Sequence, residues 1–171
     1  MTDSTELTTN KAILLAAQAK QSSLVLGALS LSARNQALQK IHSHLHSHKT
    51  DILAANQLDM TSASELVAQG KLQASMVKRL DLGREGKFES MLQGILDIMD
   101  LPDPLGRVTY ATRMDKGLEL RRVSCSLGVL LVIFEARPEV VVNITALALK
   151  SGISSLFADP SLRMSSPVQF T

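Results

Sequence analysis

The chain has 171 residues, of which 45% are hydrophobic and 20% charged, so it holds enough apolar material for one folded domain of ordinary size. A formal net charge of +2 and an aromatic content of 3% argue against nucleic-acid binding, because phosphate-tracking surfaces are strongly basic and base-stacking surfaces are aromatic. The single cysteine, Cys125, excludes an intramolecular disulfide and is typical of a reducing compartment.

Neither a membrane segment nor a targeting sequence is expected. The longest apolar run, 127–136, is interrupted by Gly128 and Glu135 and falls well short of the roughly 20 residues that cross a bilayer. Asp3 and Glu6 stand where a signal peptide or a mitochondrial presequence carries positive charge. We therefore expect a cytoplasmic protein without a membrane partner.

The first hundred residues carry the spacing of helices. Thr9 or Asn10 is the expected cap of a first helix, Ser32 caps a second, and a third begins near Thr50. The first helix places on one side Ile13, Ala16, Ala17 and Leu24, and the buried stripe of the second is Leu38, Ile41 and Leu45. The strongest pattern lies between 87 and 99, where one face holds Phe88, Met91, Leu92, Ile95, Ile98 and Met99.

After Asp100 the pattern changes to β-structure. Two prolines and a glycine in 101–106 form a turn, and apolar residues then alternate with polar ones on both sides of a second turn at 115–117, which predicts a hairpin. The apolar run 128–134 is typical of a strand buried on both faces in a parallel sheet. Pro138 begins a helix that runs to about Lys150 and stops at Gly152. A strand, a short turn and a helix open an α/β layer, so the expected fold class is α/β.

Such a unit normally continues into a second parallel strand, and here we expect none. From Ile153 onward serines and prolines dominate and periodicity is lost. The predicted organisation is therefore one partial domain over 1–152 and a divergent, disordered or irregular tail over 153–171.

The turn between the predicted strand and helix, 134–138, is the strongest candidate site. Ligands of open α/β sheets bind at the carboxyl ends of strands, where a helix N-terminus offers unpaired N–H groups. Arg137 adds a rigid donor fork suited to phosphate or carboxylate. The alternative is that Glu135 and Arg137 merely pair with each other or with neighbours. No Gly-x-Gly-x-x-Gly fingerprint is present, so a dinucleotide would have to bind in another way.

Two other features invite a chemical interpretation, and the structural interpretation is favoured for both. His42, His44, His46 and His48 form two pairs at four-residue spacing, which can chelate Zn²⁺ or Ni²⁺. The two pairs point about 160–200° apart on a helix and no nearby Cys or carboxylate completes either one, so no metal site is predicted. Cys125 has no histidine close in sequence and is expected to be a small core residue rather than a nucleophile.

Several segments, taken together, resemble the γ-glutamyl phosphate reductase (glutamate-5-semialdehyde dehydrogenase) family. The blocks that carry the resemblance are 127–143, with Phe-Glu-Ala-Arg-Pro at its centre, and 147–152. Upstream landmarks in the family's order are 52–56 with Asp59, 78–82, 94–95 and 103–106. The likeness covers roughly residues 10–152.

The resemblance implies an aldehyde dehydrogenase-like fold, of which this chain holds the N-terminal part of the NADP-binding domain. It implies NADPH-dependent reduction of L-glutamyl 5-phosphate to L-glutamate 5-semialdehyde, with release of phosphate, in proline biosynthesis. In the family a catalytic cysteine displaces phosphate to give a thioester, which hydride from NADPH reduces. By position, the expected cofactor-binding residues are Ile133, Phe134, Glu135, Ala136, Arg137 and Pro138, and Arg137 is the expected phosphate or carboxylate contact. Asn143 and Lys150 match the family pattern and are expected to be structural.

Departures from the family indicate a truncated chain. The family's cofactor-site Lys, in a Leu-Lys-Gly-Gly strand, and the segment with its catalytic Cys have no counterpart after Gly152, and Ser126 stands where the family has Pro. We therefore predict no catalytic residue in this chain and no activity when it is alone. The alternative function is an interaction module that associates with the full-length reductase. The expected partners are further copies of the chain, the full-length enzyme or glutamate 5-kinase.

Overall fold

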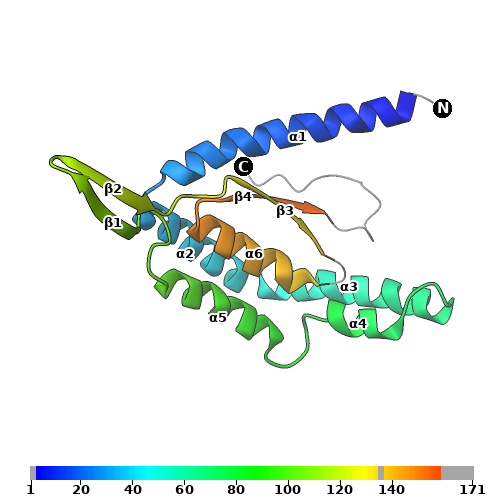
Figure 1. Cartoon of the computed structure of the whole chain (residues 1–171). Coiled ribbons are helices and arrows are strands. Elements are labelled where there is room, and N and C mark those ends of the chain that lie inside the picture. Colours follow the sequence, from blue (N-terminus) through cyan, green and yellow to red (C-terminus); the bar gives the residue numbers. More distant parts are fainter. Residues whose placement is uncertain (1–2, 135–136, 159–171) are drawn as a thin grey trace.

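The computed structural model describes residues 3–134 and 137–158 (Figure 1). Its helical part comprises α1 (Asp3–Ala28), α2 (Leu31–Ser47), α3 (Lys49–Ala68), α4 (Ala74–Leu80) and α5 (Lys87–Asp100). The strands β1 (Val108–Asp115), β2 (Leu118–Val123) and β3 (Val129–Ile133) follow, and then α6 (Pro138–Lys150) and β4 (Ser154–Ala158). The predicted α/β class and the order of helices, hairpin, strand and helix are confirmed.

The core lies where α2, α5 and α6 meet. One face of α5 is buried at Phe88, Met91, Leu92, Ile95 and Ile98, as its spacing predicts, whereas Met99 of the predicted face is only partly buried. Leu38 of α2 and Ala146 of α6 complete the buried cluster, with Ile41 and Leu45 packed against it. Helix α2 starts two residues earlier than expected, because Ser30 and not Ser32 is its cap and accepts a hydrogen bond from the Ala33 N–H at 3.2 Å.

Helix α1 differs from its prediction in extent and in its buried face. It already begins at Asp3, and Ile13 and Leu24 are exposed by 60% and 58%. The face turned toward β3 and β4 carries the buried small residues Ala19 and Ser23 instead. Small side chains let the helix approach the sheet closely, and at its end Gly27 lies against Gly152. No single described helix is long and apolar enough to span a bilayer; Lys11–Ala28 and Leu31–Ser47 pass that test only as a pair, across a 115° bend.

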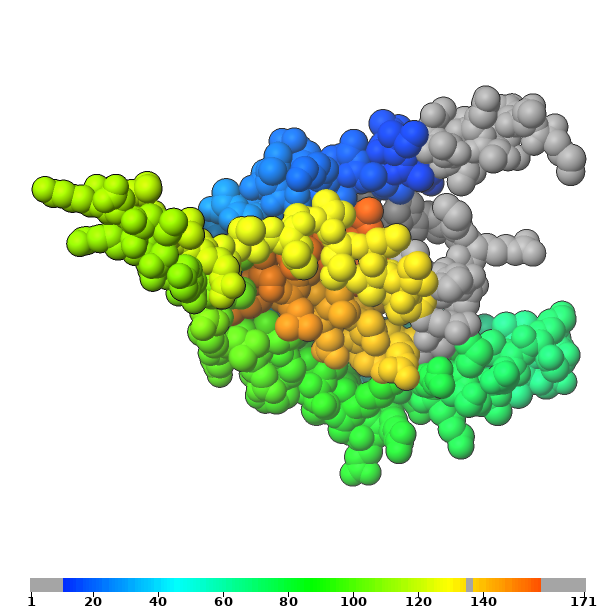
Figure 2. Space-filling model, in the orientation of Figure 1, coloured from blue at the N-terminus to red at the C-terminus, as the bar shows by residue number. Residues whose placement is uncertain are grey.

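The hairpin of β1 and β2 projects from the body of the molecule (Figures 1 and 2). Its strands are antiparallel, with Thr112 opposite Leu120, and they are joined by the predicted turn, where Gly117 has a φ of +81°. The alternation of apolar residues buries neither face, since Val108, Tyr110 and Leu120 are all more than half exposed.

The last strand corrects the prediction for the tail. Ser154–Ala158 is not disordered: it forms β4, which pairs with β3 in parallel, with Leu131 opposite Leu156 and Ile133 opposite Ala158. The predicted stop of α6 at Gly152 holds, and a hydrogen bond from the Ile153 N–H to the Ala148 carbonyl (2.8 Å) turns the chain directly into β4. The short apolar core of this strand, flanked by serines, has too little periodicity to predict it. The rest of the predicted tail, 159–171, lies outside the described residues.

Strand β3 was expected to be buried on both faces, and it is not. Leu131 and Ile133 are 59% and 67% exposed, because β4 is its one neighbour in the described sheet. Helix α1 packs on this two-stranded sheet on the side away from α5 (Figure 1). Within the described residues the sheet therefore presents apolar surface and two unpaired edges, one on each strand.

Candidate functional site

The candidate site lies at the edge where β3 and β4 both end. Because the two strands are parallel, their carboxyl ends fall together, and α6 begins beside them (Figure 1). The rings of Phe134 and Phe157 meet edge to face there, with centroids 6.1 Å apart. The predicted site follows β3 directly in the chain. The parallel pairing of β3 with β4 places the carboxyl end of β4, a strand that was not predicted, beside it.

Arg137 is the N-cap residue of α6, and Pro138 occupies the first turn as expected. The Arg137 side chain is exposed, and no described residue hydrogen-bonds or pairs with it. The Arg137 carbonyl accepts the Val140 N–H at 3.1 Å, which closes the first helical turn. A guanidinium at a helix N-terminus adds positive charge to the partial charge of the helix, so the position favours an anion.

Of the remaining predicted site residues, three lie in the part of the chain that the structure describes and two do not. Ile133 is largely exposed, while Phe134 and Pro138 are half-buried. Glu135 and Ala136 lie outside the described residues, so the alternative pairing of Glu135 with Arg137 is untested. In the first turn of the helix, Glu139 forms an ion pair with Lys87 of α5, at 3.2 Å between Oε2 and Nζ. This contact fixes the start of α6 against α5.

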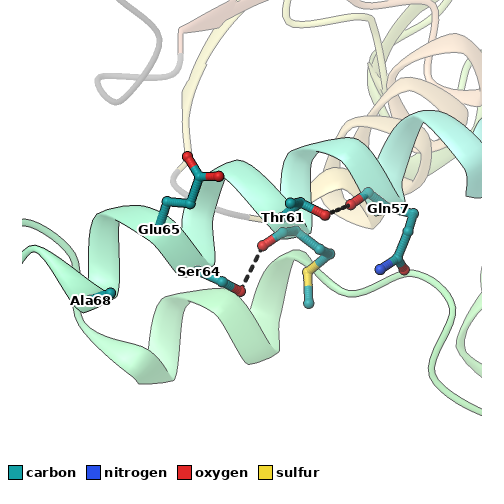
Figure 3. A pocket seen from close by; sticks show the side chains of 6 residues that line it. Gln57, Thr61, Ser64, Glu65 and Ala68 are labelled. Atoms are coloured by element: carbon teal, nitrogen blue, oxygen red, sulfur yellow. Dashed lines mark hydrogen bonds between the residues drawn. The ribbon is translucent and has the colours of Figure 1, made fainter.

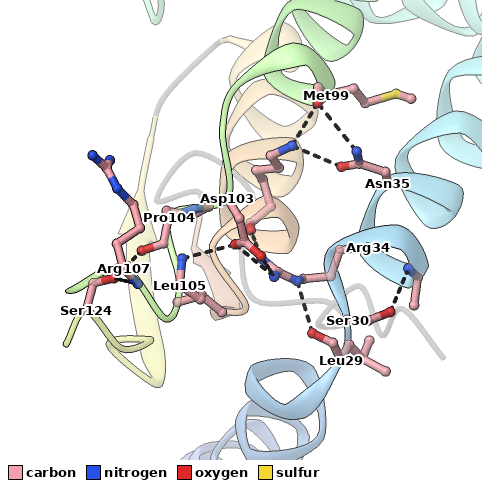
Figure 4. Close-up of polar contacts among 12 residues, drawn as sticks. Leu29, Ser30, Arg34, Asn35, Met99, Asp103, Pro104, Leu105, Arg107 and Ser124 are labelled. Atoms are coloured by element: carbon pink, nitrogen blue, oxygen red, sulfur yellow. Dashed lines mark hydrogen bonds and ion pairs between the residues drawn. The ribbon is translucent and has the colours of Figure 1, made fainter.

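The other end of α6 is held by a buried polar cluster that the sequence did not predict (Figure 4). The guanidinium of Arg34, 1% exposed, donates to both carboxylate oxygens of Asp103 at 2.8 and 2.9 Å and to the Lys150 carbonyl. The Lys150 ammonium donates to Asn35 Oδ1 at 3.0 Å and to the Met99 carbonyl at 2.7 Å. These bonds join α2, the loop after α5 and the end of α6, which agrees with a structural role for Lys150.

Hydrogen bonding, burial and neighbouring charges in this cluster shift the pKa of two groups. The Leu105 N–H, donating at 3.0 Å, and then the Arg34 guanidinium hold the pKa of the Asp103 carboxyl below its ordinary value. Burial lowers the pKa of the Lys150 ammonium, and the carboxylate of Asp103 opposes that shift. Asp103 belongs to the turn singled out at 101–106, whereas nothing local marks Arg34, whose partner lies 69 residues away.

Other hollows and reactive groups give no comparable arrangement. The groove along α3, about 500 Å³, is lined by residues of that helix alone, and the hydroxyls of Thr61 and Ser64 donate to carbonyls of their own helix (Figure 3). Cys125 is exposed, which corrects the expectation of a core residue. It precedes β3 and so lies toward the strand's amino end, opposite the candidate site. Among the residues described, no group of three or more His, Cys, Asp or Glu side chains is placed to hold a metal ion.

Comparison with known proteins identifies the family. No family model matches the chain. The crystal structure of γ-glutamyl phosphate reductase from Saccharomyces cerevisiae matches it with a TM-score of 0.82 and 43% identity, over 85% of this chain and 36% of that one. The corresponding structure from Thermotoga maritima gives a TM-score of 0.77 and 32% identity, over 85% and 34%. A probable γ-glutamyl phosphate reductase of Schizosaccharomyces pombe is 56% identical over 135 residues, 79% of this chain. The chain belongs to the γ-glutamyl phosphate reductase family.

The match also defines which part of the family is present. The chain spans about 30% of the length of the curated relatives it matches and corresponds to an N-terminal portion of a γ-glutamyl phosphate reductase. The resemblance read from the sequence is thereby confirmed, and so is the partial α/β fold that it implies.

Proposed function

We propose that this chain supplies the N-terminal, cofactor-facing part of an enzyme that reduces L-glutamyl 5-phosphate to L-glutamate 5-semialdehyde with NADPH and releases phosphate. The observation that carries the proposal is the shared edge of β3, β4 and α6, with Arg137 exposed at the start of the helix. The names of relatives 44–56% identical to the chain support the reaction, which belongs to proline biosynthesis. We also propose a cytoplasmic location.

The residues at this edge fit one end of a dinucleotide. Strand ends beside a helix N-terminus provide N–H donors and positive potential without a glycine fingerprint. Ile133 and Phe134 offer apolar surface to a flat ring, and Arg137 provides two parallel donors for a phosphate or carboxylate. Glu135, Ala136 and Pro138 complete the proposed contact set. NADPH, when bound, would supply the hydride.

No residue of this chain is proposed as the nucleophile. Its one thiol, Cys125, precedes β3 and so lies at the opposite end of that strand from Arg137, too far to reach an acyl group held there. A nucleophile must lie within bonding reach of the reacting carbon. We therefore propose that the reactive cysteine belongs to polypeptide outside these 171 residues, and that the chain alone is inactive.

A chimaera tests both parts of the proposal. Residues 1–152 would replace the matching portion of the Saccharomyces cerevisiae reductase, and NADP⁺ reduction would be followed with glutamate 5-semialdehyde and phosphate as substrates. We expect turnover from the chimaera and none from the isolated chain. Turnover by the isolated chain would contradict the placement of the nucleophile.

Substitutions in the chimaera test the role of Arg137. Arg137→Ala is expected to lower kcat/KM at least about tenfold, and Arg137→Lys to restore part of the loss, because a point charge replaces only part of a bidentate fork. Arg84→Ala, at an exposed arginine between α4 and α5, serves as the matched control and should leave kcat/KM unchanged. Equal kcat/KM in Arg137→Ala and in the unsubstituted chimaera would remove Arg137 from the site.

A second function is favoured by the open sheet. The exposed Leu131 and Ile133 on an edge strand invite pairing with another chain, and the full-length reductase is the partner we propose. Further copies of the chain or glutamate 5-kinase are the other candidates. Size-exclusion chromatography of the chain with the full-length enzyme should show co-elution at micromolar concentration, and separate elution would count against the interaction module.

A further inference from the structure

Four histidines stand at alternate positions along the end of α2. His42 and His46 form one pair at four-residue spacing, and His44 and His48 form another. The ring centroids are 6.4 Å apart in the first pair, with nearly parallel planes, and 4.2 Å apart in the second, with planes tilted by 36°. The second pair is therefore the more closely associated of the two.

The ring of His48 is held in one orientation by the backbone. Its Nδ1 lies 2.9 Å from the carbonyl oxygen of His44. A carbonyl oxygen only accepts hydrogen bonds, so the tautomer that matches this contact is the neutral ring with its proton on Nδ1 and its lone pair on Nε2. The Ser47 hydroxyl donates to the same carbonyl at 3.0 Å, and its oxygen lies 3.0 Å from Nδ1, which further restricts the orientation of the ring. Histidines that bind metals are oriented in the same way, through a second-nitrogen N–H bonded to a carbonyl.

His44 supplies the complementary ring. It is exposed, and no described residue hydrogen-bonds its side chain, so the ring is able to turn its nitrogen toward that of His48. Two neutral imidazoles one helical turn apart chelate Zn²⁺, Ni²⁺ or Cu²⁺, whereas Mg²⁺ and Ca²⁺ prefer oxygen ligands. We propose that His44 and His48 form a two-coordinate surface site for a divalent transition-metal ion, with solvent in the remaining positions.

The position of the site gives it a structural consequence. His48 is both the C-cap of α2 and the N-cap of α3, with a φ of −102° and a ψ of 18°. A metal ion joining it to His44 would tie the last turn of α2 to the residue at which the next helix begins. Bound metal therefore reduces opening of the backbone hydrogen bonds in the last turn of α2.

The other pair provides an internal comparison. His42 and His46 lie on a different side of the helix, with their rings farther apart, and no carbonyl in the described part of the chain hydrogen-bonds either ring. Chelation there requires both rings to reorient, which makes that pair the weaker one. His44→Ala and His46→Ala are thus matched substitutions of exposed histidines, and only His44→Ala removes a proposed ligand. Both leave the His44 carbonyl in place, so the orientation of His48 is preserved.

Titration of the full chain with ZnCl₂ tests the proposal, with heats and the ¹⁵N shifts of the imidazole nitrogens as readouts. Every protein carries Cys125→Ser, because an exposed thiolate is itself a zinc ligand. We expect His44→Ala to weaken zinc binding at least about tenfold, since a chelate becomes a single contact, and His46→Ala to change it by less than about threefold. In the parent protein the Nε2 signals of His44 and His48 should shift together.

Circular dichroism confirms that each variant is folded, and His44→Gln replaces His44→Ala if the latter is not. The proposal is overturned if the parent does not bind Zn²⁺ up to millimolar concentration, if His44→Ala binds as tightly as the parent, or if His46→Ala weakens binding as much as His44→Ala.

Discussion

The helical part and the β-part of this chain differ in how completely their apolar residues are buried. Around α5 the large apolar residues of one face are buried, except Met99, which is partly buried, and the buried Arg34 has acceptors for its guanidinium. In the hairpin and in β3, most apolar residues are half or more exposed. The difference shows that stability comes chiefly from the helices, whereas the strands present surface to whatever completes the sheet. Matched substitutions in the helical part and in the β-part measure how much each part contributes to the free energy of unfolding.

The largest contrast is expected between two isoleucines. Ile95→Ala, at a fully buried position, should lower the free energy of unfolding by about 4 kcal/mol, through lost burial and a residual cavity. Ile133→Ala, at a position 67% exposed, should change it by less than about 0.5 kcal/mol. Urea denaturation followed by circular dichroism gives both values. Similar losses at the two positions would mean that β3 is buried in solution.

A pair of salt bridges gives the next contrast. Asp103→Ala leaves the guanidinium of Arg34 buried without its partner and should cost about 3 kcal/mol. Glu119→Ala breaks the exposed ion pair with Arg121 on the hairpin and should cost less than about 1 kcal/mol. The same denaturation experiment applies, and a cost at Asp103 as small as that at Glu119 would show that the cluster does not hold α2 to α6.

Two glycines test the contact between α1 and the sheet. An alanine Cβ at Gly152 would lie 3.0 Å from Leu105 Cδ1 and 3.1 Å from Gly27 Cα, at a φ of +63°. Gly152→Ala should therefore cost about 2–3 kcal/mol from crowding and backbone strain together. Gly70→Ala has a similar φ of +70° and no atom within 4 Å, so it isolates the strain, about 1 kcal/mol. Equal melting temperatures for the two variants would argue against close packing of α1.

The smallest expected effect concerns pH. The pKa of Asp103 is lower in the folded chain than its ordinary value of 3.8. A carboxyl group with a lowered pKa binds its proton less readily when folded, so its stabilisation is complete above pH 3.8 and is lost as the pH falls through the folded pKa. Asp103→Asn should accordingly flatten the loss of stability below pH 4. An unchanged acid slope in urea titrations between pH 5 and 2.5 would contradict this role.

The elements that were predicted correctly are those specified by residues within them or next to them in the sequence. The stripe of α5, the hairpin turn, β3 and the start and stop of α6 follow from apolar spacing, Gly117, Pro138 and Gly152. Helix α1 has apolar residues around its whole circumference, so its spacing did not reveal that Ala19 and Ser23 face the sheet. Strand β4 depends on pairing with β3, which a five-residue segment does not encode by itself.

The candidate site was likewise predicted only where its residues are marked by their neighbours in the sequence. Arg137 at the strand-to-helix turn is visible in the sequence, because Pro138 marks the helix start. The second strand end and the Phe134–Phe157 contact were missed because they depend on β4. Arg34 gave no signal, since Asp103 and Lys150 reach it only in the folded chain.

The hydrogen bond between Arg34 and the Lys150 carbonyl has a consequence for biosynthesis. The two residues are separated by 116 positions, so a ribosome adding about 5–20 residues per second needs roughly 6–23 s to deliver the acceptor after the donor. Throughout that interval the Arg34 guanidinium lacks its acceptor on Lys150, and water takes that place. The final packing of α2 on the end of α6 can therefore form only after Lys150 has left the exit tunnel.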